Sequence, residues 1–495
     1  MSDSRHSQAV WFGLFLLFII NGIYLYRSVD IEQSNRPIPN DSPMNLHMEA
    51  PADAFRHGSN QSTFHQSQTH PENYTLDDPT PPSSHSSAVD DDTPILTMYG
   101  PHRAKQSLQK LPKWLQEYFA WHTAQRQNDP EGDNTKFLVM TCFVGRKCGG
   151  TSDRLRPLAY YLHLANLSKR VFIIKWTKPH DLSEFFVPTG VVDWRAPADI
   201  ESAIAEGKMP DFEMKKRKCG GVGITECTGI AVEKLQQSND KYYSITVPNS
   251  FQSTNTANSV FQSVSYDNNM PCIHQWKYPD MFGDIFRVMF QPVPAIAREI
   301  NATMSSLGLV ESLYVSTHVR SRYPVGPLRR MEVDKDGGLN LEDGNLKSYL
   351  DGIGINALDC VTKLESNLPV FFVSDSHVYT DFMISKTDVI LPATNGKPVS
   401  IRGKMHAEEP LHIDKDDGWP GSKPQDFYSV FEDLLIMGGS KCVAHGIGSF
   451  GSMGAGLIGN ECRAIHRMYN GNQQKCPNNR ADKDMCALNQ TEMDA

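Results

Sequence analysis

The chain has 495 residues, of which 39% are hydrophobic and 21% are charged, and its formal net charge is -9. This length is enough for a large core and for two or three domains, and the composition is that of a globular protein. Nucleic-acid-binding proteins present a basic surface, but the longest basic run here is the short segment KKRK at 215–218. We therefore predict that the protein has no nucleic-acid partner.

The N-terminus carries an apolar run, AVWFGLFLLFIINGIYLY at 9–26, which is 18 residues long and has no charge. As a helix it would reach about 27 Å, close to the thickness of a bilayer core. A cleaved signal peptide, the alternative, has a shorter apolar core and ends in small residues. We predict a cytosolic tail at 1–8, a transmembrane signal-anchor at 9–26 and membrane association through it.

Residues 27–105 are rich in Pro, Ser, His and Asp and cannot bury much apolar surface, so we expect a disordered stem. The chain has 10 cysteines and no C-x-x-C motif, which disfavours zinc ribbons and favours disulfides of open connectivity in an exported protein. Several cysteines are closely spaced, as in Cys142/Cys148, Cys219/Cys227, Cys442/Cys462 and Cys476/Cys486. Together these features predict a single-pass type II protein of the Golgi or ER membrane with a lumenal globular part.

The first half of that part alternates strands and helices. A helix is expected over 108–122, a buried strand over 136–144, a glycine loop at 148–157, a helix after it, and a strand over 169–176. Another strand is expected at 241–248, followed by a mainly helical stretch over 280–307. This order predicts a parallel sheet and a first Rossmann-like, acceptor-side domain at 106–305.

The second half repeats the pattern. Strands are expected at 312–321, 369–376, 388–392, 441–446 and 462–468, helices over 345–365 and 426–439, and a polar insertion at 393–423. We predict a second Rossmann-like domain at 306–475, a tail at 476–495, and an α/β fold in which two such domains face a cleft.

Glycines at positions 446, 448 and 451 form the pattern G-x-G-x-x-G between a strand and a helix. The backbone N–H groups of such a helix N-terminus favour phosphate. A nicotinamide or flavin dinucleotide would also require an acidic residue about 20 positions later, and none is well placed there. The alternative is that small residues allow the helix to pack closely on the sheet.

Two further strand ends carry polar side chains. His318 and Arg320 alternate along the strand STHVRS, so both point to one face, and arginine suits bidentate phosphate binding. Asp375 follows the buried strand VFFVS at the same predicted edge of the sheet. A surface ion pair of Arg320 and a helix cap by Asp375 are the alternatives.

These motifs resemble those of the GDP-fucose-dependent fucosyltransferase superfamily, and the loop around Gly149 and Gly150 resembles its glycine-rich N-terminal motif. The resemblance covers about 136–468. It implies a GT-B fold, inverting transfer of fucose from GDP-fucose to a glycan or protein hydroxyl, and no metal or other cofactor. It implies that His318 and Asp375 contact the guanine and ribose, that Arg320 neutralises the diphosphate, and that the phosphates and sugar are wrapped by Ser449, Phe450, Gly451 and Ser452.

The segment after Arg320, Ser321 to Pro324, departs from the family because relatives often have a carboxylate there. Asp153, in the first loop, is a candidate base for the acceptor hydroxyl; a helix cap or an ion pair with Arg154 or Arg156 is the alternative. Glu332 and Asp334 are other candidate bases. Two other functions stay open. A lumenal sulfotransferase would need a phosphate-binding loop with a well-placed Lys, and a non-catalytic glycan-binding protein would bind an acceptor without transfer.

Overall fold

The computed structural model describes residues 98–144, 148–214, 224–246, 278–322, 339, 341–342, 344–405, 410–413, 419–459, 462–466 and 476. The expected cytosolic tail, the signal-anchor and nearly all of the stem lie outside these residues. In the described part of the chain, no helix has the length and apolar character needed to cross a bilayer. Residues 88–495 form one compact unit.

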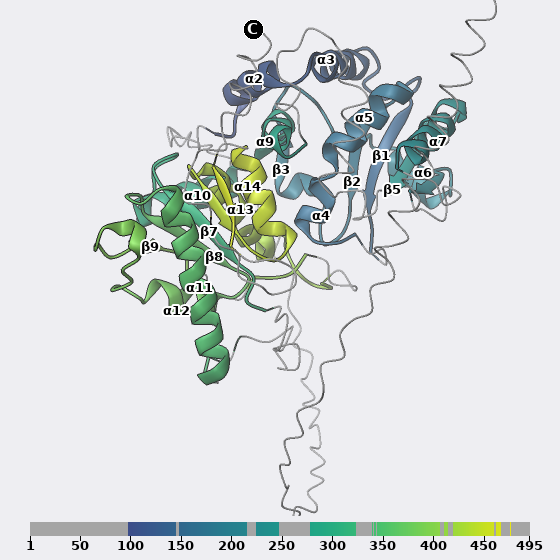
Figure 1. Cartoon of the computed structure of the whole chain (residues 1–495). Helices are drawn as coiled ribbons and strands as arrows, with labels where there is room; N and C mark the ends of the chain where they lie inside the picture. Colours follow the sequence, from purple (N-terminus) through teal and green to yellow (C-terminus); the bar gives the residue numbers. More distant parts are fainter. Residues whose placement is uncertain are drawn as a thin grey trace, which may run out of the picture. The chain divides into compact units, whose positions relative to one another are not determined.

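The first half contains a four-stranded parallel sheet with the order β2-β1-β5-β4 (Figure 1). Buried apolar side chains fill β1 and β2, as in parallel sheets that are covered on both faces. The strands are β1 (Phe137–Cys142), β2 (Val171–Trp176), β4 (Asp211–Glu213) and β5 (Tyr242–Thr246). The helices are α3 (Lys113–Asn128), α4 (Thr151–Leu155), α5 (Leu158–Ser168), α6 (Ile200–Ala205) and α7 (Ile224–Gln237), with a short 3-10 helix η1 (Leu182–Glu184).

A proline divides the expected helix over 108–122, and another separates the expected helix after the glycine loop from a short helix, α4, that forms inside that loop. Pro112 separates α2 (Pro101–Lys110) from α3, and Pro157 separates α4 from α5. Proline lacks an N–H and its ring clashes with the preceding turn, so it begins a helix more readily than it continues one. Because α2 begins at Pro101, the last residues of the expected stem are helical rather than disordered.

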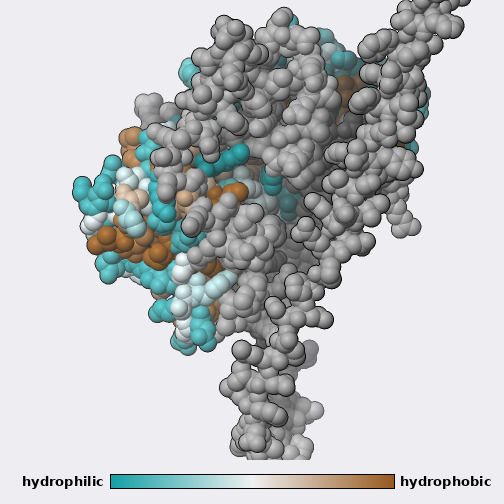
Figure 2. Space-filling view, viewed as in Figure 1, coloured by the Kyte–Doolittle hydropathy of each residue, from teal (hydrophilic) through white to brown (hydrophobic). Residues whose placement is uncertain are grey.

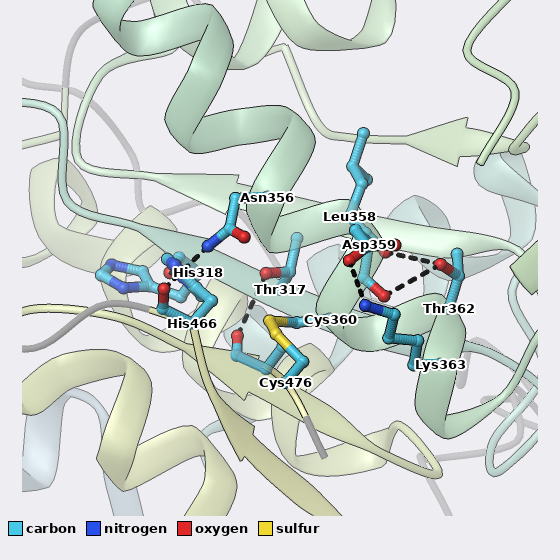
Figure 3. The surroundings of a disulfide bond; sticks show 11 residues. Thr317, His318, Asn356, Leu358, Asp359, Cys360, Thr362, Lys363, His466 and Cys476 are labelled. Carbon is cyan, nitrogen blue, oxygen red and sulfur yellow. Dashed lines mark hydrogen bonds and ion pairs between the residues drawn. A yellow bond between two sulfur atoms is a disulfide. The ribbon is translucent and has the colours of Figure 1, made fainter. Parts of the chain in front are cut away.

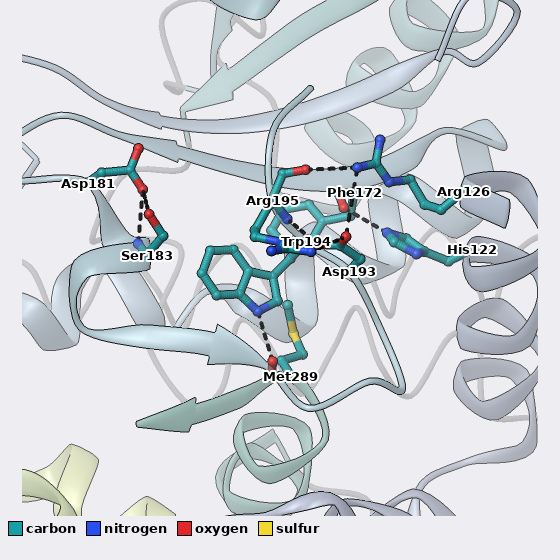
Figure 4. Close-up of polar contacts among 9 residues, drawn as sticks. All are labelled: His122, Arg126, Phe172, Asp181, Ser183, Asp193, Trp194, Arg195 and Met289. Atoms are coloured by element: carbon teal, nitrogen blue, oxygen red, sulfur yellow. Dashed lines mark hydrogen bonds and ion pairs between the residues drawn. The ribbon is translucent and has the colours of Figure 1, made fainter. Parts of the chain in front are cut away.

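A connecting region joins the two halves. It comprises α9 (Tyr278–Met289), the antiparallel pair β3 (Phe186–Pro188) and β6 (Phe290–Pro292), and α10 (Pro294–Leu307). Figure 4 shows a contact that fastens a loop of the first half to this region, in which the Trp194 indole donates to the Met289 carbonyl at 2.8 Å. The same view shows a contact inside the first half, where the His122 ring of α3 lies 2.9 Å from the Phe172 carbonyl of β2. The expected helical stretch over 280–307 is therefore two helices around a short strand.

The second half contains a five-stranded sheet with the order β11-β10-β7-β8-β9, parallel throughout. The strands are β7 (Val315–Val319), β8 (Val370–Ser374), β9 (Ile401–Arg402), β10 (Val443–His445) and β11 (Arg463–Ile465). The helices are α11 (Gly344–Leu364), α12 (His377–Ile384), α13 (Tyr428–Gly439) and α14 (Ser449–Ile458), with 3-10 helices η5 (Pro392–Thr394) and η6 (Pro424–Phe427).

One expected strand is absent from this sheet. In the segment DVILP, Ile390 forms only an isolated antiparallel bridge to Pro398, and the edge strand is instead β9, inside the expected polar insertion. Ile390 is exposed, as is Val378 on α12. Figure 2 shows hydrophobic surface mixed with hydrophilic surface over the side of the molecule where β9 and α12 lie.

In both sheets, the chain first adds strands on one side of an inner strand and then adds the later strands on its other side. After β7 the chain adds β8 and β9 on one side and then returns to place β10 and β11 on the other. In the first sheet β2 lies on one side of β1, and β5 and β4 on the other. Ligands of open α/β sheets bind at the carboxyl ends of the strands at such reversals.

Disulfides connect loops at both ends of the strands. Cys142–Cys148 closes the loop after β1, and Cys442–Cys462 links the starts of β10 and β11. Cys476 pairs with Cys360 of α11, so its close spacing to Cys486 is misleading (Figure 3). Cys227 is also disulfide-bonded.

Candidate functional site

A cavity of about 480 Å³ lies where the carboxyl ends of β1, β7, β8 and β10 come together. This volume suits a nucleotide-sized ligand. Both halves of the chain line it, as expected for two sheets that face a cleft. The predicted site residues on its wall are Gly150, Asp153, His318, Arg320, Asp375, Ser449 and Phe450.

The N-terminus of α14 opens into this cavity. Its first backbone N–H groups have no partner within the helix and carry partial positive charge, which favours an anion. Gly448, the N-cap, has φ +94, and a Cβ there would lie 3.0 Å from Cδ and Nη1 of Arg320. Only glycine fits both the backbone conformation and the close approach. Arginine and helix terminus therefore present positive charge side by side.

The other members of the glycine motif have a packing role. A Cβ on Gly451 would lie 2.8 Å from Nδ1 of His318, and a Cβ on Gly446 would lie 2.5 Å from Cε1 of His466. These two glycines let α14 and its loop approach the sheet. Gly451 and Ser452 are not on the cavity wall, and the Ser452 hydroxyl donates to the Ser449 carbonyl at 2.8 Å.

Asp375 organises the loop that carries Arg320. Its Oδ1 accepts hydrogen bonds from the Ser321 N–H at 2.6 Å, the Ser321 hydroxyl at 2.8 Å and the Arg322 N–H at 3.2 Å. Its Oδ2 lies 3.9 Å from Nε of Arg320. The N-cap of α12 is Ser376, so the alternative that Asp375 caps this helix is wrong. Both charged side chains remain partly accessible, at 22% for Arg320 and 28% for Asp375.

His318 lies beneath the helix terminus with only 3% of its surface exposed, and its ring packs on Phe450 with centroids 5.3 Å apart. Figure 3 shows its carbonyl oxygen beside the ring of His466, whose Nε2 is 3.0 Å away; Asn356 in turn donates to the His466 carbonyl at 2.8 Å. Burial lowers the pKa of His318 to about 4, with Asp375 and Asp433 opposing and Arg320 reinforcing the shift. The ring is therefore neutral near pH 7.

The free energy of unfolding should fall in mild acid because the buried His318 and His445 both have lowered pKa values. Burial also lowers the pKa of His445 to about 3, with His466 adding to the effect. Between the unfolded value of about 6.5 and the folded values, the unfolded chain binds more protons, so stability falls as the pH falls through this window. His318 alone should cost about 2 kcal/mol between pH 7 and pH 5. Thermal melts over that range test this expectation, and a melting temperature that stayed constant would contradict it.

Asp153 lies at the junction of the two halves. Its Oδ2 accepts from the Gly150 N–H at 3.1 Å, and its Oδ1 lies 3.4 Å from the Ser449 hydroxyl on α14. The first contact is the helix-capping role given as the alternative, and the second places the carboxylate at the cavity. Gly149 has φ +75 and a Cβ there would lie 2.5 Å from Cβ of Asp153, so it shapes the loop without lining the cavity.

Sequence reasoning missed several cavity residues. Asp433, which is 8% exposed, and Val430 reach the cavity from α13, which the sequence indicated only as a helix. An acid within the run of apolar residues VFEDLLIM was the available signal. Arg322 also lines the cavity, as do residues of the polar insertion, which carried no motif: Pro410, Leu411, His412, Ile413 and Trp419. Among the described residues, no cluster of His, Cys, Asp and Glu is arranged to hold a metal ion.

No protein-family model and no curated protein matches the chain. Solved structures with partial likeness to the chain include those of fucosyltransferases. A variant of Arabidopsis thaliana FUT1 in complex with GDP has a TM-score of 0.43 and 12% identity, covering 74% of this chain and 80% of that one. Fucosyltransferase NodZ from Bradyrhizobium has a TM-score of 0.38 and 12% identity, covering 70% and 100%. A NodZ α-1,6-fucosyltransferase co-crystallised with GDP has a TM-score of 0.37 and 12% identity, covering 68% and 96%.

Proposed function

We propose that the protein is a glycosyltransferase of the GT-B type that moves fucose, with inversion, from GDP-fucose to a hydroxyl of a glycan or glycoprotein. The observation that carries this proposal is the close approach of the Arg320 side chain to Gly448, where it leaves no room for a Cβ, at the N-terminus of α14. It combines a guanidinium with unpaired backbone N–H groups on one wall of the cavity, which is the arrangement that a diphosphate requires.

Further residues of the cavity wall suit a guanine base. Asp433 is a buried carboxylate on the wall, and a carboxylate can accept the two adjacent N–H donors of guanine. Uracil presents a single N–H flanked by two carbonyl oxygens. These oxygens are acceptors and would be repelled by the carboxylate of Asp433. The apolar neighbours Val430 and Phe450 can contact the faces of the base and ribose. We therefore favour a guanine nucleotide as the donor.

The transfer step places negative charge where the site is positive. The acceptor oxygen attacks C1 of fucose, the bond from C1 to the β-phosphate oxygen breaks, and GDP leaves with an additional negative charge. Arg320 and the α14 terminus stabilise that charge as it develops, without rearrangement. Asp153, on the opposite half of the chain, is the proposed base that takes the hydroxyl proton. No metal or other cofactor is part of this proposal.

The location of the protein is likewise a proposal and rests on the sequence. The apolar run at 9–26, the polar segment after it and the disulfides favour a type II protein of the Golgi or ER membrane with the enzyme in the lumen.

Nucleotide preference tests the proposed function. In calorimetry with the full-length protein in detergent, we expect GDP to bind at least 10-fold more tightly than UDP, because only guanine matches the carboxylate of Asp433. Adenosine 3′,5′-bisphosphate, the nucleotide product of sulfotransferases, should bind no better than UDP. Equal or tighter binding of UDP would exclude the GDP-fucose donor, and preference for the bisphosphate would favour a sulfotransferase.

A further inference from the structure

The polar insertion sends a short stretch of chain onto the cavity. We name its described residues 410–413 and 419–423 the strap. Leu411, His412 and Trp419 of the strap line the cavity, and Gly150 of the first glycine loop faces the His412 ring, with 3.8 Å from a Cβ built on that glycine to the ring. The strap therefore lies against the same loop that carries Asp153, on the side of the cavity formed by the first half of the chain.

Arg154 fixes the strap to that loop. The residue is only 4% exposed. Its guanidinium donates to the Gly149 carbonyl at 2.8 Å, to the Ile413 carbonyl at 3.0 Å and to the Lys178 carbonyl. The same group lies over the Trp176 ring, 5.0 Å from its centroid. The planar guanidinium of Arg154 thus holds together three loops that are distant in sequence, those of Gly149, Lys178 and Ile413. A lysine ammonium cannot reproduce this set of hydrogen bonds.

Trp419 is held within the strap in one orientation. Its indole N–H donates to the His412 carbonyl at 2.8 Å, and its own carbonyl accepts from the Ser422 hydroxyl at 2.7 Å. Ser422 also lies 3.2 Å from Nε2 of His180, which fastens this end of the strap to the first half of the chain. With its N–H already bonded to protein, the half-buried indole contributes an apolar ring face to the cavity wall.

We propose that the strap is the acceptor wall of the proposed transferase, that Trp419 stacks on a pyranose ring of a glycan acceptor, and that Arg154 is the positioning residue that holds this wall. The inference rests on the proposed function, because Arg320, Asp433 and α14 are assigned to the donor and leave the strap and Asp153 for the acceptor. A pyranose has an apolar C–H face that packs on an indole and hydroxyls that reach neighbouring polar groups such as His412 and Asp153. A peptide acceptor offers no such ring.

Glycan binding, measured separately from transfer, tests the inference. Full-length protein in detergent with saturating GDP is applied to an array of free and protein-linked oligosaccharides and to glycan-free Ser/Thr peptides. We expect binding to oligosaccharides and not to the peptides. Trp419→Ala should weaken that binding about 10-fold and Trp419→Phe about threefold, while GDP affinity stays unchanged. Trp114→Ala is the matched control, because Trp114 is also half-buried but is not on the cavity wall.

Arg154→Lys tests the positioning role. It should weaken oligosaccharide binding with GDP affinity retained, whereas a general loss of folding would lower both. The proposal is overturned if the wild-type protein binds no oligosaccharide, if Trp419→Ala binds as tightly as wild type, or if Trp419→Ala loses GDP affinity, which would assign the indole to the base. Failure of the wild-type protein to bind GDP would instead contradict the proposed function.

Discussion

Replacing Arg320 with alanine should lower the rate of fucose transfer by about 100-fold or more and leave the melting temperature nearly unchanged. The rate should fall because a charge donor aimed at the leaving diphosphate is removed. Stability should hold because the side chain is partly accessible and its separation of 3.9 Å from Asp375 makes a weak ion pair. Steady-state kinetics with GDP-fucose and a thermal melt of the same preparation measure both quantities.

Two further variants test which property of Arg320 matters and whether Asp153 has a different role. Arg320→Lys should recover only part of the rate, since an ammonium keeps the charge and loses the bidentate fork. Asp153→Asn separates the leaving-group role from the base role: it should lower the rate while GDP affinity is retained. If Arg320→Ala transferred fucose at nearly the wild-type rate, Arg322 or the N-terminus of α14 alone would have to hold the diphosphate.

Replacing Asp375 with alanine should weaken GDP binding by about 10- to 100-fold and lower the melting temperature. The backbone N–H groups of Ser321 and Arg322 would lose their shared acceptor, and each lost hydrogen bond to a charged group costs about 1.5–3 kcal/mol. The loop that carries Arg320 would then no longer be fixed. Calorimetry with GDP and a thermal melt check the two effects.

Asp375→Asn is the matched comparison for this variant. The asparagine oxygen can still accept from the Ser321 N–H, so binding should be weakened less than in Asp375→Ala. If the two variants behaved alike and the melting temperature of both were normal, Asp375 would act through its charge on the ligand and not through the loop.

The sequence alone was enough for the parallel α/β architecture and for the part of the cavity wall that we propose binds the donor. Buried strands such as β1 and β8 are continuous apolar runs, and parallel pairing places the residues that follow them at one edge of the sheet. This is why His318, Arg320, Asp375 and Gly448, which belong to three separate strand ends, could be expected in one cavity.

The parts that were missed depend on tertiary contacts. The strap has no periodic pattern, and it lies on the cavity because Arg154 bonds a carbonyl oxygen 259 residues away. In the sequence, Asp433 looks like a surface residue of a helix. In the structure, α13 is buried on nearly all sides, and Asp433 is buried with it. Gly446 and Gly451 matched a phosphate motif, but close packing against His466 and His318 explains both of them. The pairing of Cys360 with Cys476 could not be read from cysteine spacing.

Transfer itself tests the central claim most directly. Full-length protein is incubated with GDP-fucose labelled in the fucose, with GDP-mannose, UDP-galactose and UDP-N-acetylglucosamine in parallel reactions, and with an oligosaccharide panel as acceptors. We predict that label passes to oligosaccharide from GDP-fucose alone and that GDP forms in equal amount. Transfer from a UDP-sugar, or tight GDP binding without transfer or hydrolysis of GDP-fucose, would contradict the assignment of this cavity to a fucosyltransferase.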